Sequence, residues 1–181
     1  MGAITRTFAN QIKTGGKLDA DGLDLTDTFA FTGTVSGAGG INTPAFQARS
    51  TTPFAIANNT DVKIQYAVED FDTDSCYDTA AYRFTPNVAG KYFVYARFTY
   101  DTDVDFEDIR LKIGKNGSTA EADSLGNSVY YNHLANFTII ELNGTTDYVE
   151  AFTQQHSGSS KNSLSNVSGK RNVFGAYKIV E

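Results

Sequence analysis

Three aspartates at alternate positions in the segment DTDVDFED have the side-chain chemistry of a calcium site. Asp101, Asp103 and Asp105 match the first ligand positions of a helix–loop–helix calcium loop. Such a loop also needs glycine at its sixth position and glutamate at its twelfth, where this chain has Phe106 and Lys112. That motif is therefore excluded. We expect a solvated acidic loop, with a looser oxygen site for calcium as the alternative.

A second acidic segment, EDFDTDS, offers carboxylates of the same kind. Its Asp72 and Asp74 are further candidate calcium ligands, and the same solvated loop is the competing interpretation. We expect no other cofactor.

The residues suited to nucleophilic or acid–base catalysis are few. The two histidines are His133 and His156, the one cysteine is Cys76, and no G-x-S-x-G nucleophile pattern is present. A catalytic thiol needs a nearby base and a lowered pKa, and the residues beside Cys76 offer neither. We therefore expect a protein that is not an enzyme.

Composition narrows the class further. The chain has 181 residues, a formal net charge of −6 and no cluster of Lys and Arg, which argues against nucleic-acid binding. No apolar run is long enough to span a membrane, and the first residues do not have the pattern of a signal peptide. One cysteine cannot form an intrachain disulfide. We expect assembly in a cytoplasm without membrane insertion.

Alternation of apolar and polar residues predicts strands in most of the chain after residue 42. Short turns rich in Gly, Asn, Ser and Pro separate them, and we find no long helical period. The predicted fold is an all-β, antiparallel sandwich or jelly roll. The candidate strands are 45–50, 62–68, 82–85, 90–100, 109–114, 134–142, 147–156 and 172–180.

Two of these strands carry large apolar residues on both faces. In GKYFVYARFTY, Phe93 and Tyr95 lie on the face opposite to Tyr92, Val94 and Ala96, and NVFGAYKIV is also apolar on both sides. One face lines the core, so the other needs a covering surface. We predict subunit contact through Phe93, Tyr95, Phe174 and Tyr177.

Several motifs resemble one family. Their order is similar to that in the globular head of complement component one-q and its tumour-necrosis-factor-like relatives: PAFQA, VKIQYAVED, YD, RFTP, GKYFVYARF, LKIGKNGS, LNGTTDYVEAF and NVFGAYKI. The resemblance covers residues 44–181. It implies a ten-stranded jelly roll, packing as a homotrimer, and a binding module rather than an enzyme. The head domain is accordingly expected at 43–181.

Residues 1–42 are small, polar and Gly-rich, and they lack enough apolar residues for a core of their own. They resemble the N-terminal segments of bacteriophage tail-fibre and appendage proteins of the marine phage type. We expect an extended assembly arm ending in a Gly-rich linker, with a disordered N-terminus as the alternative. The expected contacts to other virion proteins are Ile4, Phe8, Phe29 and Phe31.

These observations favour a phage virion surface protein, a trimeric tail fibre or appendage module that attaches to the virion and contacts the host. A host glycan or protein is the expected ligand, with the loop 156–172 and Tyr130 and Tyr131 as candidate contacts. The interpretation that competes for this loop, and that its composition favours, is an exposed variable connection. The alternatives are a capsid decoration or cement (head fibre) protein and a bacterial lectin-like adhesive module. A glycan depolymerase has no supporting carboxylate pair.

Overall fold

The computed structural model describes residues 12–13, 17–18, 42–100, 106–126, 133–164 and 172–179. The chain divides into two compact units, Met1–Gly39 and Gly40–Glu181. In the first unit, the described residues form one antiparallel pair, β1 (Ile12–Lys13) with β2 (Lys17–Leu18). The second unit, called the head below, holds the other described strands.

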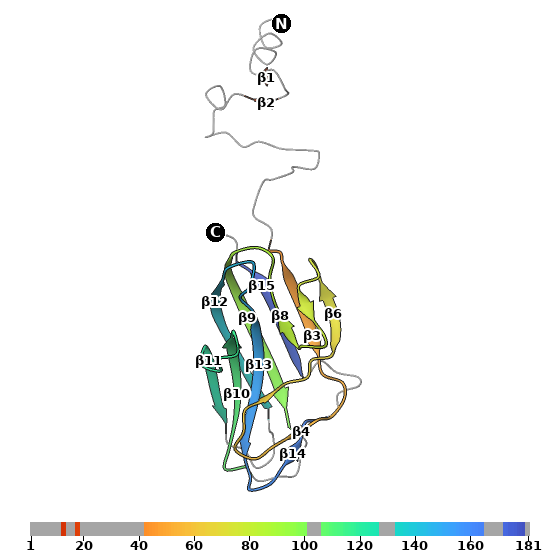
Figure 1. Ribbon diagram of the computed structural model, residues 1–181, viewed down its shortest axis with the longest axis vertical. Helices are drawn as coiled ribbons and strands as arrows, with labels where there is room; N and C mark the ends of the chain where they lie inside the picture. The colour runs from red at the N-terminus through yellow and green to blue at the C-terminus, as the bar shows by residue number, and fades with distance from the viewer. Residues whose placement is uncertain are drawn as a thin grey trace, which may run out of the picture. The chain divides into compact units, whose positions relative to one another are not determined.

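Two antiparallel sheets make up the head (Figure 1). The five-stranded sheet has the order β12 (His133–Leu142), β9 (Gly90–Thr99), β15 (Val173–Lys178), β3 (Ala45–Arg49) and β6 (Val68–Asp72). The six-stranded sheet has the order β11 (Ala122–Gly126), β10 (Asp108–Lys115), β13 (Val149–His156), β8 (Arg83–Phe84) and β7 (Tyr77–Asp78), and β5 (Val62–Lys63) also pairs with β13. A small pair joins β4 (Ala55–Ile56) to β14 (Lys161–Asn162).

This architecture confirms the predicted all-β, antiparallel jelly-roll class. Most predicted strands lie within a residue or two of those observed, but the single strand expected over 62–68 is wrong. The chain leaves the six-stranded sheet after β5 and joins the five-stranded sheet at β6. Between them, Ile64 and Tyr66 are buried in the core, and Tyr66 N–H donates to the Ile64 carbonyl at 3.1 Å. The alternating pattern continues through this crossing although the hydrogen-bonding partner changes.

Aromatic rings fill the space between the sheets. Phe46 of β3 stacks on Tyr77 at 4.5 Å and on Phe84 at 4.6 Å between ring centroids, and Phe174 meets it edge-on at 5.1 Å. All four rings are buried. Burying one large apolar side chain contributes about 1.5–3 kcal/mol, so this cluster is a main source of the head's stability.

Buried tyrosines satisfy their hydroxyl groups on backbone carbonyls. Tyr66 donates to Arg97, Tyr77 to Tyr66, and Tyr92 to Val88, at oxygen–oxygen distances of 3.0, 2.9 and 2.6 Å. Burial raises the pKa of all three phenols, that of Tyr92 to about 12. The hydroxyls therefore stay protonated donors at neutral pH, and the core carries polar rings without unpaired donors.

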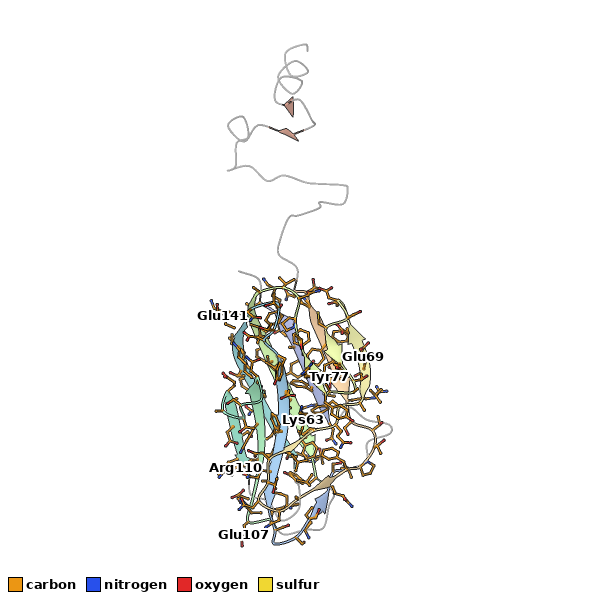
Figure 2. All side chains as sticks on the ribbon, in the orientation of Figure 1. Lys63, Glu69, Tyr77, Glu107, Arg110 and Glu141 are labelled. Carbon is orange, nitrogen blue, oxygen red and sulfur yellow. The ribbon has the colours of Figure 1, made fainter. Side chains whose placement is uncertain are left out.

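The five-stranded sheet extends across the full width of the head. Its edge strands are β12 and β6, and Figure 2 shows Glu141 of β12 and Glu69 of β6 at opposite sides of the molecule. No helix occurs among the residues that the structure describes, so none of them forms a helix that could cross a membrane.

Candidate functional site

An apolar surface lies on the outer face of the five-stranded sheet, on the side away from the core. We call Phe93, Tyr95, Phe137, Ile139 and Tyr177 the outer aromatic patch. Cross-strand register aligns Ile139, Phe93 and Tyr177 in one row, and the next row pairs Phe137 with Tyr95. Exposed fractions are 68% for Phe137, 59% for Ile139 and 38% for Tyr177. In the single chain, large apolar side chains thus face water on neighbouring strands.

Phe93 is the centre of this patch. Its ring centroid lies 5.4 Å from that of Tyr177, 5.9 Å from Phe137 and 6.2 Å from Tyr95. The four rings come from β9, β12 and β15, so they form one continuous surface rather than scattered apolar residues. Continuous apolar patches of this kind mark interaction sites, because leaving them in water is unfavourable.

Tyr95 lies across the neighbouring strand above Gly175. A Cβ atom at position 175 would lie 2.3 Å from the Tyr95 hydroxyl oxygen and 2.4 Å from Cζ, closer than atoms approach in real structures. Beyond Gly175, the Tyr95 hydroxyl donates a 2.9 Å hydrogen bond to Oε1 of Gln47 on β3. Burial raises the pKa of Tyr95, partly offset by the Arg97 guanidinium. Glycine at 175 therefore lets a side chain of β9 reach β3 over the intervening β15.

Polar groups continue from Tyr95 to the far edge of the sheet. Gln47 Nε2 donates to Asp70 Oδ2 at 2.7 Å, and Arg49 forms an ion pair with the other oxygen of Asp70. We call Tyr95, Gln47, Asp70 and Arg49 the outer polar chain. The Asp70 side chain is only 9% exposed, although β6 is an edge strand. The outer polar chain borders the aromatic patch on the β3 side, and Phe71 of β6, which lies opposite Gln47 in the register and is 47% exposed, is a further apolar residue on this face.

The predicted contact residues divide between the two sides of the sheet. Phe93, Tyr95 and Tyr177 lie on the outer face, but the placement of Phe174 at a subunit interface is wrong. Phe174 is fully buried within one chain, where it stacks on Tyr66 at 5.5 Å. Phe174 and Tyr177 are three residues apart in one strand, so they must point to opposite faces.

Sequence reasoning missed Phe137 and Ile139, the most exposed members of the patch. The alternation in LANFTIIEL places them together on one face and could have identified them. It also missed Gln47 and Asp70, which have no signal in the local sequence because their contacts with Tyr95 and with each other cross between strands.

The acidic segments give no metal centre in the described part of the chain. Asp72 Oδ2 accepts the Tyr77 N–H at 2.7 Å and Oδ1 accepts the Asp74 N–H at 3.2 Å, so Asp72 organises a turn. No group of three His, Cys, Asp or Glu residues that could hold a metal ion occurs among the described residues. Asp101, Asp103 and Asp105 lie outside those residues, and calcium there stays untested.

The histidines and the cysteine are engaged in structural contacts. His133 Nδ1 lies 2.9 Å from the Thr99 hydroxyl. His156 Nδ1 lies 2.7 Å from an oxygen of Asp108, and its Nε2 lies 2.5 Å from Oδ1 of Asn59. Burial raises the pKa of the Cys76 thiol, which disfavours the reactive thiolate.

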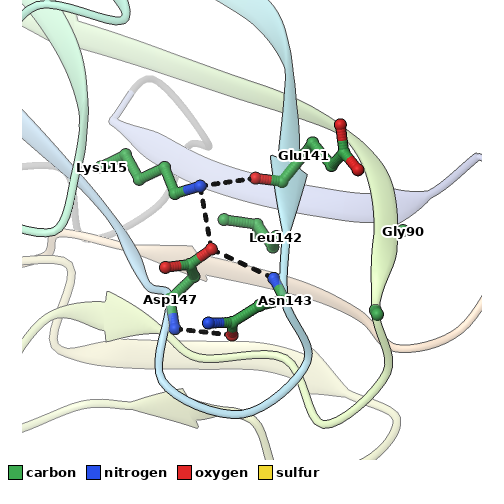
Figure 3. Close-up of a pocket in the computed structure, with 7 residues that line it drawn as sticks. Gly90, Lys115, Glu141, Leu142, Asn143 and Asp147 are labelled. Atoms are coloured by element: carbon green, nitrogen blue, oxygen red, sulfur yellow. Dashed lines mark hydrogen bonds and ion pairs between the residues drawn. The ribbon is translucent and has the colours of Figure 1, made fainter.

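A hollow of about 340 Å³ lies beside the start of β9 (Figure 3). Its central group, the Asp147 carboxylate, accepts hydrogen bonds from Asn116 Nδ2 at 2.8 Å and the Asn143 N–H at 3.1 Å and pairs with Lys115 Nζ at 2.8 Å. Those donors, Lys115 first, lower the pKa of Asp147. Because they hold adjacent loops together, we interpret the hollow as structural. The other lining residues are Ala89, Gly90, Glu141 and Leu142.

Several predicted contact residues lie outside the described part of the chain. These are Ile4, Phe8, Phe29 and Phe31 of the predicted arm, and Tyr130 and Tyr131. Their predicted roles in virion docking and host contact stay predictions.

Of the comparisons with known proteins, the search of solved structures found matches. No protein-family model matches the chain, and no curated protein matches it. The crystal structure of murine APRIL at pH 8.5 has a TM-score of 0.52 at 10% identity, covering 75% of this chain and 98% of that one. The APRIL structure at pH 5.0 has a TM-score of 0.52 at 13% identity with the same coverage. The globular domain of zebrafish complement 1qA protein has a TM-score of 0.48 at 15% identity, covering 75% and 97%.

The APRIL likeness shows the fold of the head. At these identities it shows the fold alone, and together with the sheet order it defines a jelly roll of the tumour-necrosis-factor type.

Proposed function

We propose that this chain is a non-enzymatic attachment module that works as a homotrimer. The observation that carries the proposal is the outer aromatic patch, whose Phe137 and Ile139 are more than half exposed in a single chain. The patch is continuous over three strands, and Phe and Tyr are residue types that are enriched at interfaces. A second copy of the chain is the occupant.

The position of the patch within the sheet supports a closed ring. Phe137 and Ile139 lie on the edge strand β12, whereas Phe93, Tyr95 and Tyr177 lie on the inner strands β9 and β15. The β12 edge residues of one chain can therefore pack against the sheet face of a second chain. The sheet face of the first chain then stays free to receive the β12 edge of a third chain. Contacts between different surfaces of identical chains generate rings when the rotation closes. The family resemblance of the sequence supports a ring of three.

The described side chains support binding rather than catalysis. Both histidines have polar partners that hold loops or strand ends, and the buried thiol of Cys76 has a raised pKa. Three identical heads would bind a repetitive surface with an avidity far above that of one head.

The proposed setting is a bacteriophage virion, with the N-terminal segment attached to other virion proteins and the heads directed at the host surface. The support is the Thr- and Gly-rich composition of residues 1–42 and its likeness to phage fibre segments.

Self-association is tested by sedimentation velocity on the full chain and on the double variant Phe137→Ser/Ile139→Ser. The wild type should sediment at three times 19.6 kDa, and the variant as a folded monomer with the same circular dichroism spectrum. A wild type that stays monomeric at a chain concentration of about 100 μM would contradict the proposal.

The virion role has a separate test. A phage that supplies this chain without residues 1–40 should yield virions that lack the protein, while the truncated heads still form trimers. Virions that incorporate the truncated chain normally would refute the arm's role. The isolated trimer should also bind whole host cells, and the Phe137→Ser/Ile139→Ser monomer should bind them more weakly.

A further inference from the structure

The outer polar chain is unusual because it buries a carboxylate on an otherwise open sheet face. The Asp70 side chain is 9% exposed, whereas Phe137 on the opposite edge of the same sheet is 68% exposed. Burying a carboxylate is costly unless it is paired and hydrogen-bonded, and both conditions hold here through Arg49 and Gln47. The members of this network depend on one another, because removing one side chain leaves its neighbour without a hydrogen-bond or ion-pair partner.

In the outer polar chain, the donor and acceptor capacities of the side chains determine the direction of each hydrogen bond. The Asp70 carboxylate can only accept, so Gln47 presents its Nε2 to it. Gln47 Oε1 is then oriented toward Tyr95, whose hydroxyl uses its one hydrogen to reach it. The Tyr95 oxygen is left with lone pairs and no free hydrogen. A surface that docks here must therefore bring a donor to this oxygen or leave it in water.

The geometry of the sheet makes this arrangement depend on one position. β15 separates β9 from β3, so the path from Tyr95 to Gln47 crosses Gly175. With the ring held there, Tyr95 lies flat and fills the space that a side chain on β15 would otherwise take. The Tyr95 ring consequently has a fixed place on the β3 side of the patch, beside the rings of Phe93 and Tyr177.

We propose that the outer polar chain determines the register in which a second copy of this chain docks on the outer aromatic patch. This rests on the self-association proposed above. The outer polar chain holds Tyr95 in one orientation. It also disfavours a docked copy that is shifted toward β3 and β6, because such a shift would cover paired charges and the Tyr95 oxygen without supplying a hydrogen-bond donor. Tyr95 and Gly175 act as positioning residues for the interface, with Gln47 and Asp70 acting through Tyr95.

The experiment compares two variants that each remove one phenolic oxygen from the same patch. Tyr95→Phe breaks the outer polar chain, and Tyr177→Phe is the matched control on the adjoining strand. We expect Tyr95→Phe to raise the dissociation constant of the assembly about tenfold and Tyr177→Phe to change it less than about threefold, measured by sedimentation equilibrium. Asp70→Asn should weaken association in the same direction as Tyr95→Phe.

If Tyr95 had only a structural role, Tyr95→Phe would lower the stability of the monomer rather than weaken association directly. Both single variants are therefore also made in the Phe137→Ser/Ile139→Ser background, where thermal unfolding should change equally little for each. Equal effects of Tyr95→Phe and Tyr177→Phe on association would overturn the inference while leaving self-association intact. So would a Tyr95→Phe loss fully accounted for by the monomer's unfolding. A monomeric wild type would overturn the proposed function and this inference together.

Discussion

The two outer faces of the head share the same strand alternation but differ in chemistry. The five-stranded sheet presents mainly the outer aromatic patch, with the Arg49–Asp70 ion pair toward its β6 edge, whereas the six-stranded sheet presents several ion pairs. On the latter, Lys63 pairs with Glu150, Lys112 with Asp61 at 2.7 Å, and Arg110 with Asp123 at 3.3 Å. Leu125, opposite Arg110 on β11, is a large apolar residue exposed on this face.

This difference teaches which face is adapted to water. Exposed ion pairs such as Arg110–Asp123 cost a sheet face little, because water screens and solvates the charges. Under the proposed self-association, the aromatic face of the five-stranded sheet would be covered by another chain, and that chain would bury its rings. The fold alone does not distinguish the two faces, but their side chains do.

The largest expected effect on stability comes from ionising the buried tyrosines of the core between the two sheets. Burial raises the pKa of Tyr66, Tyr77, Tyr92 and Tyr100 above that of a free phenol, so these residues favour folding while protonated. Their contribution is complete below about pH 10 and is lost as the pH rises toward and beyond 12, the approximate pKa of Tyr92. Titration at 295 nm should show these phenols ionising together with loss of the β-sheet circular dichroism signal. Ionisation of all ten tyrosines near pH 10 in a folded protein would contradict this.

The charged face should be sensitive at one buried pair. The Glu150 side chain is 4% exposed and Lys63 is its ion-pair partner. Lys63→Ala leaves that carboxylate buried and unpaired, so we expect a loss of about 2 kcal/mol in the free energy of unfolding. Urea unfolding of the Phe137→Ser/Ile139→Ser monomer measures it without interference from association. Lys63→Arg is the control and should recover most of the loss, and an unchanged midpoint for Lys63→Ala would show that the pair contributes nothing.

The aromatic face should respond more in assembly than in stability. Gly175→Ala places a methyl group where the Tyr95 ring lies, so the ring must move. Because Tyr95 is a movable side chain rather than backbone, we expect the monomer to lose only about 1 kcal/mol, while association weakens clearly. Gly175 does not have a positive φ, so the added methyl group brings contact with Tyr95 without left-handed backbone strain. Normal assembly of Gly175→Ala would contradict the positioning role of this glycine.

The smallest effect is expected at the exposed edge of the charged face. Asp123 is 41% exposed and its partner Arg110 is 34% exposed. Asp123→Ala should change the free energy of unfolding by no more than about 0.5 kcal/mol and should leave assembly unchanged. A large effect on sedimentation would place this face in an interface and reverse the comparison.

Much of the fold follows from local sequence patterns. Alternation and turn residues predict the long strands β9, β10, β12 and β13, because each strand buries one face and the turns between them need Gly or Asn. The short strand β11, ADSLG, escapes prediction since it lacks β-branched and aromatic residues and is held by pairing with β10.

The candidate site is less predictable for a physical reason. Parity places Phe93 and Tyr95 on the outer face, and applied strictly it would have placed Phe174 in the core. The contacts from Tyr95 to Gln47 and from Gln47 to Asp70 join residues 48 and 23 positions apart. They depend on the order of β9, β15, β3 and β6 in the sheet, which no local pattern contains.

The position of β3 has a mechanical consequence. β3 is the first strand of the head, and it lies between β15 and β6 with antiparallel hydrogen bonds to both. A tension that enters the head at Ala45 and is resisted at the opposite end acts along β3, in the direction that shears both ladders. Since ladder hydrogen bonds run perpendicular to the strands, shear loads them together rather than one at a time. Because β3 is hydrogen-bonded on both sides, it is well placed to resist a pulling force applied at the start of the head.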